Sequence, residues 1–294
     1  MAAIQSQISH GAVPGAVSNV CPIGTKFHVL EVGWLECDEG FVTRGGNTSL
    51  KCNETNTFVN KRRPLPMYCI LVDHPHEGLI LWDTGSGKDY PEVWGPQIAE
   101  VFARIKYEPK HELRAAVEAT GHKLEDVKKI IISHLHLDHA GGLDEFYDNT
   151  DVEVWVHENE FHSAFWSNAT GADSAVYLAH YLKLSFNWKT FTDQTFDFCQ
   201  GITLHHLPGH TDGLIGMQIN MPDTGTFVFI SDHCHVIENW RDGIPQGWLA
   251  RDHPSWFRSY QRLKQLERTT RGLIIPGHDE GVYLKLIENG TVFT

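Results

Sequence analysis

The sequence predicts an α/β protein in which a single domain covers residues 26–294 and an N-terminal arm covers residues 1–25. Three observations support this class. Segments of strand character and segments of helical character mix along the chain, and no repeat of fixed period interrupts them. The 294 residues provide enough chain for one large core. Hydrophobic residues make up 41% and charged residues 21%, an ordinary globular balance.

Each element rests on local composition. The first 25 residues are rich in Gly, Ala and Ser, which indicates a loosely attached arm. Runs of apolar, β-branched and aromatic residues predict strands at 27–36, 67–73, 78–83, 129–133, 152–156, 202–207, 214–220, 226–231 and 273–275. Helical spacing predicts helices at 97–106, 111–120, 158–166 and 255–267. Two stretches, at about 38–64 and 167–200, are expected to be irregular insertions.

Charge and targeting signals exclude several classes of protein. The formal net charge of −13 disfavours nucleic acid as a partner, because a negative field repels phosphate backbones. The first 20 residues lack the basic and apolar regions of a secretory signal, and no apolar run is long enough to cross a bilayer. The six cysteines form no CxxC pair. We therefore expect a cytoplasmic protein with reduced thiols and no membrane partner.

The strongest chemical signal is Ser133-His134-Leu135-His136-Leu137-Asp138-His139. Three histidines and one aspartate fall within six residues, directly after an apolar strand. Neutral imidazoles and carboxylate oxygens are the expected ligands of Zn²⁺ and similar metals. The Gly141-Gly142 pair that follows allows a tight turn and a close backbone approach. The segment therefore predicts part of a metal site.

Three more candidate ligands come from elsewhere in the chain. His210 follows the strand at 202–207, Asp232 follows the strand at 226–231, and His278 follows the strand at 273–275. Each lies at the C-terminal end of a β segment, so we expect all three to converge on one edge of a sheet with the histidine-rich segment.

The ordered set DTG, HLHLDHAGG, PGH, SD and PGH resembles the metallo-β-lactamase superfamily from about residue 27 to residue 280. The resemblance implies an αββα sandwich of two mixed sheets with outer helices. It assigns His134, His136 and His210 to one metal and Asp138, His139 and His278 to a second, with Asp232 bridging both. It gives Asp83 the task of orienting the ligand loop.

Within the superfamily, the chain is similar to the N-acyl homoserine lactonase group. His139 replaces the Arg of the antibiotic-degrading enzymes, and His136 replaces the Glu of the flavodiiron branch. The segment from Ile244 to Lys264 also resembles that group. One position departs from it, because His235 stands where the group has a substrate-binding tyrosine. His235 could donate a hydrogen bond to the substrate, act as an extra ligand, or only pack.

The resemblance implies a hydrolase with two Zn²⁺ ions, or Fe, Co or Mn, that opens a lactone by attack of a metal-bridging hydroxide. Asp138 would move protons and His235 would polarise the carbonyl. A cyclic amide or cyclic carbamate is the main alternative substrate, and a thioester, a phosphoester or a non-enzymatic scaffold are others. A homodimer is also implied. The predicted pocket walls are Trp34, Leu35, Phe161, Phe165 and Trp166.

Overall fold

The computed structural model describes residues 19–48, 60–173 and 175–294. The first sheet contains eight strands, in the order β13-β1-β2-β3-β5-β6-β7, with β4 also paired to β1. Their bounds are β1 Lys26–Asp38, β2 Arg62–His74, β3 Gly78–Trp82, β4 Ala103–Lys106, β5 Val127–Ile131, β6 Glu153–His157, β7 Asn187–Phe191 and β13 Val292–Phe293.

The second sheet contains five strands, in the order β12-β11-β10-β9-β8. Their bounds are β8 Thr195–Cys199, β9 Ile202–His206, β10 Ile215–Met221, β11 Gly225–Phe229 and β12 Leu273–Ile275. Both sheets are mixed, because β5 pairs in parallel with β3 and β6, and β12 pairs in parallel with β11, whereas the hairpins are antiparallel.

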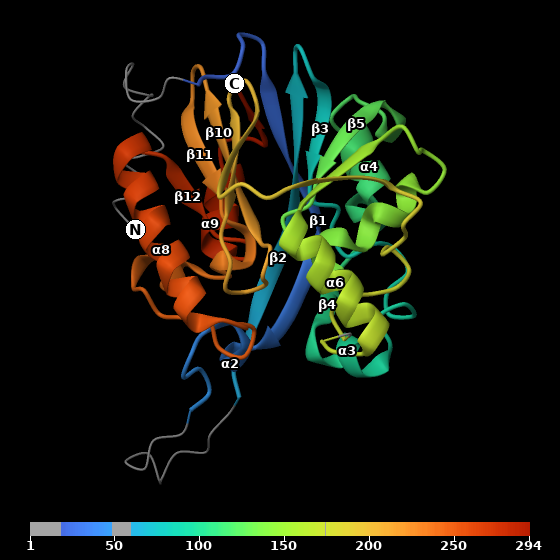
Figure 1. Ribbon diagram of the computed structural model, residues 1–294, viewed down its shortest axis with the longest axis vertical. Helices are drawn as coiled ribbons and strands as arrows, with labels where there is room; N and C mark the ends of the chain where they lie inside the picture. Colours follow the sequence, from blue (N-terminus) through green and yellow to red (C-terminus); the bar gives the residue numbers. More distant parts are fainter. Residues whose placement is uncertain (1–18, 49–59, 174) are drawn as a thin grey trace.

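Helices cover the outer faces of both sheets, whereas α9 (Glu280–Ile287) packs into the apolar cluster between the sheets (Figure 1). Their bounds are α2 Glu39–Val42, α3 Pro96–Val101, α4 Leu113–Glu118, α5 Leu137–Ala140, α6 Glu158–Thr170, α7 Ile237–Arg241, α8 His253–Thr270 and α9 Glu280–Ile287. Helices α3, α4 and α6 lie on the side of the first sheet, and α8 lies outside the second. The predicted αββα sandwich is confirmed. Across the described ranges, no helix is long and apolar enough to span a membrane.

The core follows from the two-residue period of the strands. In β2, Ile70 and Val72 face the layer between the sheets, whereas Cys69 and Leu71 face the layer under α4 and α6. All four side chains are buried, because both faces of the strand are covered. A third apolar cluster joins the second sheet to Trp256 and neighbouring residues of α8. The strand ends that carry the site are therefore rigidly packed.

Two expectations about secondary structure are wrong. The helix predicted at 97–106 ends at Val101, and residues 103–106 form β4, whose pairing with β1 overrides their helical propensity. The stretch at 167–200 is not irregular throughout, because it contains β7 and β8. The other predicted insertion contains α2 and the start of β2, and its residues 49–59 lie outside the described chain.

The last residues of the predicted arm pack against the second sheet. The Cys21 side chain is buried, and its backbone N–H donates to the Asn220 carbonyl at 2.8 Å. The Asn19 side chain accepts a hydrogen bond from the Gly201 N–H at 2.7 Å. Residues 1–18 lie outside the described chain.

Candidate metal centre

The histidine-rich segment leaves β5 and enters the short helix α5, and Asp83 at the end of β3 fixes its shape. One Asp83 oxygen accepts the Ser133 N–H at 2.7 Å, and the other accepts the Ser133 hydroxyl at 2.8 Å. The second oxygen also lies 2.9 Å from His139 Nδ1. A proton on Nδ1 leaves His139 Nε2 free to bind a metal. Asp83 thus contacts both Ser133 and His139, as a residue that orients the ligand loop would.

Glycine is required where this loop meets the turn after β3. A Cβ on Gly141 would lie 2.4 Å from the carbonyl carbon of Ser86, a distance that the backbone cannot accept. The Thr84 N–H donates to the His139 carbonyl at 2.7 Å across the same contact. The predicted close approach at Gly141 therefore locks the ligand segment against the strand that carries Asp83.

The first donor group consists of His134, His136 and His210, whose ligand atoms lie within 4.8 Å of one another. All three side chains are buried, and burial holds the pKa of each well below its usual range, so the rings are neutral. His134 Nε2 has no hydrogen-bond partner among the described residues, and His136 Nδ1 faces His210 Nε2 at 3.0 Å. Buried, neutral and unpartnered imidazole nitrogens are what a metal ligand requires.

The second donor group consists of Asp138, His139, Asp232 and His278, again within 4.8 Å. His278 Nδ1 lies 3.0 Å from the Pro66 carbonyl, its hydrogen-bond acceptor, so that Nε2 faces the site. Asp138 is the most exposed member, with 14% of its side chain accessible. A carboxylate at the rim of the group can reach both the site and the solvent.

Asp232 connects the two groups. Its Oδ1 lies 3.2 Å from His139 Nε2 and 2.9 Å from His278 Nε2. Its Oδ2 lies 3.5 Å from His210 Nε2 and 3.8 Å from His134 Nε2. Burial raises the pKa of this carboxyl, but the surrounding histidines outweigh burial and hold the pKa well below its usual range. An anionic carboxylate therefore presents one oxygen to each group.

The donor set fits two divalent cations of the kind that imidazole and carboxylate bind. The sequence predicted that all the donors lie at one edge of a single sheet, and this is wrong because the donors come from both sheets. His134 to His139 follow β5 of the first sheet, whereas His210, Asp232 and His278 follow strands of the second. The sandwich brings the two sets together at the edge that the sheets share.

Gln246 positions His210, and sequence reasoning missed it. Its side chain is fully buried, and its carbonyl oxygen lies 3.2 Å from His210 Nδ1. Its amide nitrogen donates to the backbone carbonyls of Asp232 and His233. One side chain thus orients a ligand of the first group and holds the loop that carries Asp232. No motif marks Gln246, which lies in an irregular loop before α8.

Glu160 in α6 is a second missed residue. Its buried carboxylate accepts hydrogen bonds from Leu135 N at 2.8 Å and from Tyr177 Oη at 3.3 Å. The other oxygen accepts from Thr211 Oγ1 at 2.5 Å and from Gly213 N at 3.2 Å. Burial raises the pKa of Glu160, and these hydrogen bonds oppose the rise. Glu160 connects the histidine-rich segment to the loop that carries His210, although both of these segments are far from Glu160 in sequence.

His235 lies inside the centre. Its side chain is 1% exposed, and its Nε2 lies 3.1 Å from Asp232 Oδ2. It forms a third donor group with His210 and Asp232. The sequence left open whether this residue contacts substrate, binds metal or packs.

The predicted pocket walls have packing contacts in this structure. Trp34 and Leu35 are buried in the two apolar clusters of the first sheet. Phe161 packs against Phe165 at a tilt, with ring centroids 4.4 Å apart, and both rings contact Trp188. By contrast, Trp166 is 68% exposed. A role for these residues in substrate binding stays a prediction.

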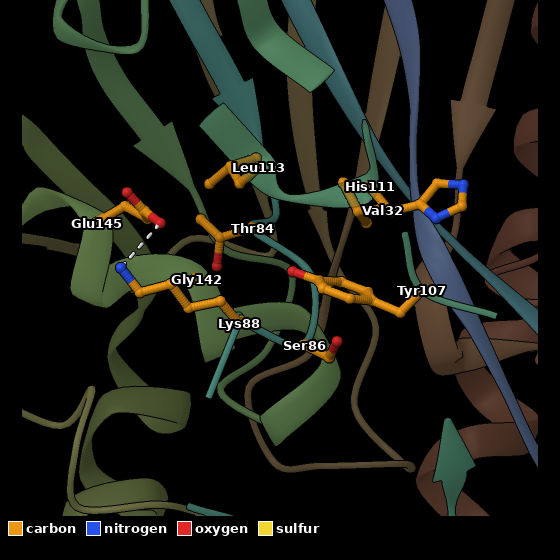
Figure 2. A pocket seen from close by; sticks show the side chains of 10 residues that line it. Val32, Thr84, Ser86, Lys88, Tyr107, His111, Leu113, Gly142 and Glu145 are labelled. Atoms are coloured by element: carbon orange, nitrogen blue, oxygen red, sulfur yellow. Dashed lines mark ion pairs between the residues drawn. The ribbon is translucent and has the colours of Figure 1, made fainter. Parts of the chain in front are cut away.

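A small cavity lies beside the turn after β3 (Figure 2). It is lined by Thr84, Ser86, Gly142 and neighbouring residues, and at about 10 Å³ it holds no more than about one water molecule. Lys88 and Glu145 form an ion pair of 3.6 Å at its side. None of the residues of the three donor groups lines this cavity.

The sequence profile of the metallo-beta-lactamase superfamily matches residues 62–278, and the chain belongs to this superfamily. Among its relatives is the N-acyl homoserine lactonase AiiB of Agrobacterium fabrum, 23% identical over 279 residues that cover 91% of this chain and 98% of the relative. An N-acyl homoserine lactonase of a Bacillus species is 28% identical over 218 residues, covering 73% and 82%.

Solved structures share the fold. An N-acyl homoserine lactone hydrolase with the product N-hexanoyl-L-homoserine bound at its catalytic metal center has a TM-score of 0.72 and 24% identity, covering 88% of this chain and 95% of that one. The dizinc quorum-quenching lactonase AidC has a TM-score of 0.64 and 17% identity, covering 90% of each. The resemblance noted from sequence is confirmed.

Proposed function

We propose that this protein is a metal-dependent hydrolase that opens the ring of a lactone, with acyl homoserine lactones as the first class to test. The observation that carries the proposal is the arrangement around Asp232, whose two oxygens face two separate groups of imidazoles. The relatives that are lactonases support the choice of substrate class.

His134, His136 and His210 would hold one metal, and Asp138, His139 and His278 would hold the other, with Asp232 between them. We propose Zn²⁺, and Fe, Co or Mn suit the same donors. Two bound cations would lower the pKa of a shared water and stabilise negative charge on the substrate carbonyl oxygen. Asp83, Gln246 and Glu160 keep the donors in position.

We assign the proton transfer to Asp138. Its carboxylate lies 3.7 Å from His139 Nε2 and 3.5 Å from His278 Nε2, and its side chain is partly exposed. It accepts a proton from the attacking water and passes it to the ring oxygen as the ring C–O bond breaks. The products are one hydroxyl and one carboxylic acid, which is ionised at neutral pH and so releases a proton. The homodimer and the cellular location stay predictions from the sequence.

Acid release tests this proposal. Purified, zinc-loaded protein would be mixed in a pH-indicator assay with acyl homoserine lactones of two chain lengths, a simple γ-lactone and a δ-lactone. We expect turnover by the wild type and a loss of at least about 100-fold in Asp232→Asn, since metals contribute several kcal/mol to the barrier. Asp223→Asn, an exposed turn residue, is the matched control. Turnover of a cyclic amide or carbamate with none of the lactones would contradict the proposal.

A further inference from the structure

We propose that His235 is an additional metal ligand, which joins His210 and Asp232 at the first donor group. The inference rests on the proposed metal centre and adds a ligand to it. It replaces the substrate-facing role that the sequence suggests with a role in holding the metal.

The ring of His235 is buried between ligands. It contacts His210 edge-on, with centroids 5.1 Å apart, and stacks on His278 at 5.9 Å with an interplanar angle of 22°. Its Nε2 is 3.1 Å from Asp232 Oδ2, the oxygen that also faces His210 and His134. A side chain that is 1% exposed has little surface left for a substrate.

Neither ring nitrogen of His235 has a hydrogen-bond partner among the described side chains and backbone groups. The short distance to Asp232 does not supply one, because the N–H direction of the ring does not meet the carboxylate oxygen. An unpartnered polar group in a buried site costs about 1–3 kcal/mol. His134 Nε2, which lies 3.8 Å from the same Asp232 oxygen, shares this property. A cation beside Asp232 Oδ2 would satisfy both His134 Nε2 and His235 Nε2.

The backbone holds His235 in this place from both sides. Its N–H donates to Asn239 Oδ1 at 3.0 Å, and Asn239 also anchors Val236 and the Val42 carbonyl. The His235 carbonyl accepts the N–H of His278 at 2.9 Å. The residue is thus fixed between helix α7 and a ligand of the second group, which is the preorganisation that a ligand needs.

His233 provides an internal comparison. It is also fully buried, with both ring nitrogens unpartnered among the described residues. However, its ring stacks on Trp256 at 5.4 Å and belongs to none of the donor groups. Burial and missing partners alone therefore do not make a ligand; the position beside Asp232 and His210 does.

The test counts ligands in cobalt-loaded protein. Each imidazole bound to Co²⁺ gives a shifted ring N–H signal in the proton NMR spectrum. We expect six in the wild type, from His134, His136, His139, His210, His235 and His278, and five in His235→Phe. His233→Phe is the matched control and should keep six. Residues that only orient ligands contribute roughly 10–100-fold to metal affinity, so loss of His235 should weaken Co²⁺ binding by about 100-fold or more in a chelator competition.

Five signals in the wild type, all retained in His235→Phe with unchanged affinity, would overturn the inference and leave the proposed centre intact. A wild type that shows no shifted signals and binds no Co²⁺ would instead reject the metal centre itself. The wild-type count decides the matter even if His235→Phe fails to fold.

Discussion

Replacing Glu160 with glutamine tests whether a buried carboxylate joins the two ligand loops. In the wild type, one oxygen accepts from Leu135 N and Tyr177 Oη, and the other accepts from Thr211 Oγ1 and Gly213 N. The amide nitrogen of glutamine must take the place of one oxygen. Each Glu160 oxygen accepts from one hydroxyl and one backbone N–H. Beside the new amide nitrogen, the hydroxyl can rotate and accept a hydrogen bond, but the backbone N–H faces another donor and loses its acceptor.

One buried N–H without an acceptor costs about 1–3 kcal/mol, and the hydrogen bonds that remain lose their charge assistance. Part of this loss of stability is offset, because the substitution also removes a carboxylate whose charge is disfavoured by burial. We expect Glu160→Gln to lose about 2–3 kcal/mol, which for a domain of this size corresponds to a fall in Tm of about 4–10 °C. Metal affinity should also fall, by roughly 10–100-fold.

Circular dichroism melting of metal-free protein, followed by chelator competition, measures both effects. Glu158→Gln, in the first turn of the same helix, is the matched control because it makes the same chemical change without the four hydrogen bonds that Glu160 accepts. If Glu160→Gln melts within about 1 °C of the wild type and binds metal equally well, then the carboxylate does not join the loops as argued.

Three further changes have defined outcomes. Gln246→Leu leaves His210 Nδ1 without its acceptor, and a roughly 10–100-fold weaker metal affinity in a chelator titration is expected; an unchanged affinity would reject the positioning role. Burial raises the pKa of Asp144 to about 6, so ionising this carboxyl destabilises the fold as the pH rises from about 4 through 6. Asp144→Asn should match the wild type near pH 4 and gain about 1 kcal/mol above pH 7 in urea unfolding, and a gain independent of pH would refute this. Gly141→Ala places a Cβ against Ser86 and should lower the Tm by several degrees, whereas an unchanged Tm would show that the turn can shift.

The sequence was sufficient to predict the candidate metal donors, because each follows a strand within a short recognisable motif. His134, His136, Asp138 and His139 lie within six residues, and the structure brings them to His210, Asp232 and His278. The sequence could not show that these donors come from two sheets, because the way in which the two sheets pack face to face depends on long-range contacts. For the same reason, Gln246 and Glu160 carry no local signal, since their partners lie far away in sequence.

The errors in secondary structure have similar causes. Residues 103–106 have ordinary helical propensity, and only pairing with the edge of β1 makes them a strand. The strand β8 had a usable signal, because Phe196 and Phe198 alternate with polar residues before a glycine turn at Gly201, where φ is +87°. The aromatic residues that precede β8, Trp188 and Phe191, made the whole stretch resemble an irregular insertion.

Stepwise metal loading, with lactone turnover measured in the same sample, shows whether the two donor groups form the catalytic centre. Protein stripped by a chelator would receive increasing Zn²⁺, and bound metal and acid release from an acyl homoserine lactone would be followed together. We expect the stripped protein to be inactive, turnover to rise to a maximum near about two bound ions, and Asp232→Asn to stay below this maximum. Full turnover in the stripped protein, or none in protein with both ions bound, would show that a two-metal centre does not open the lactone.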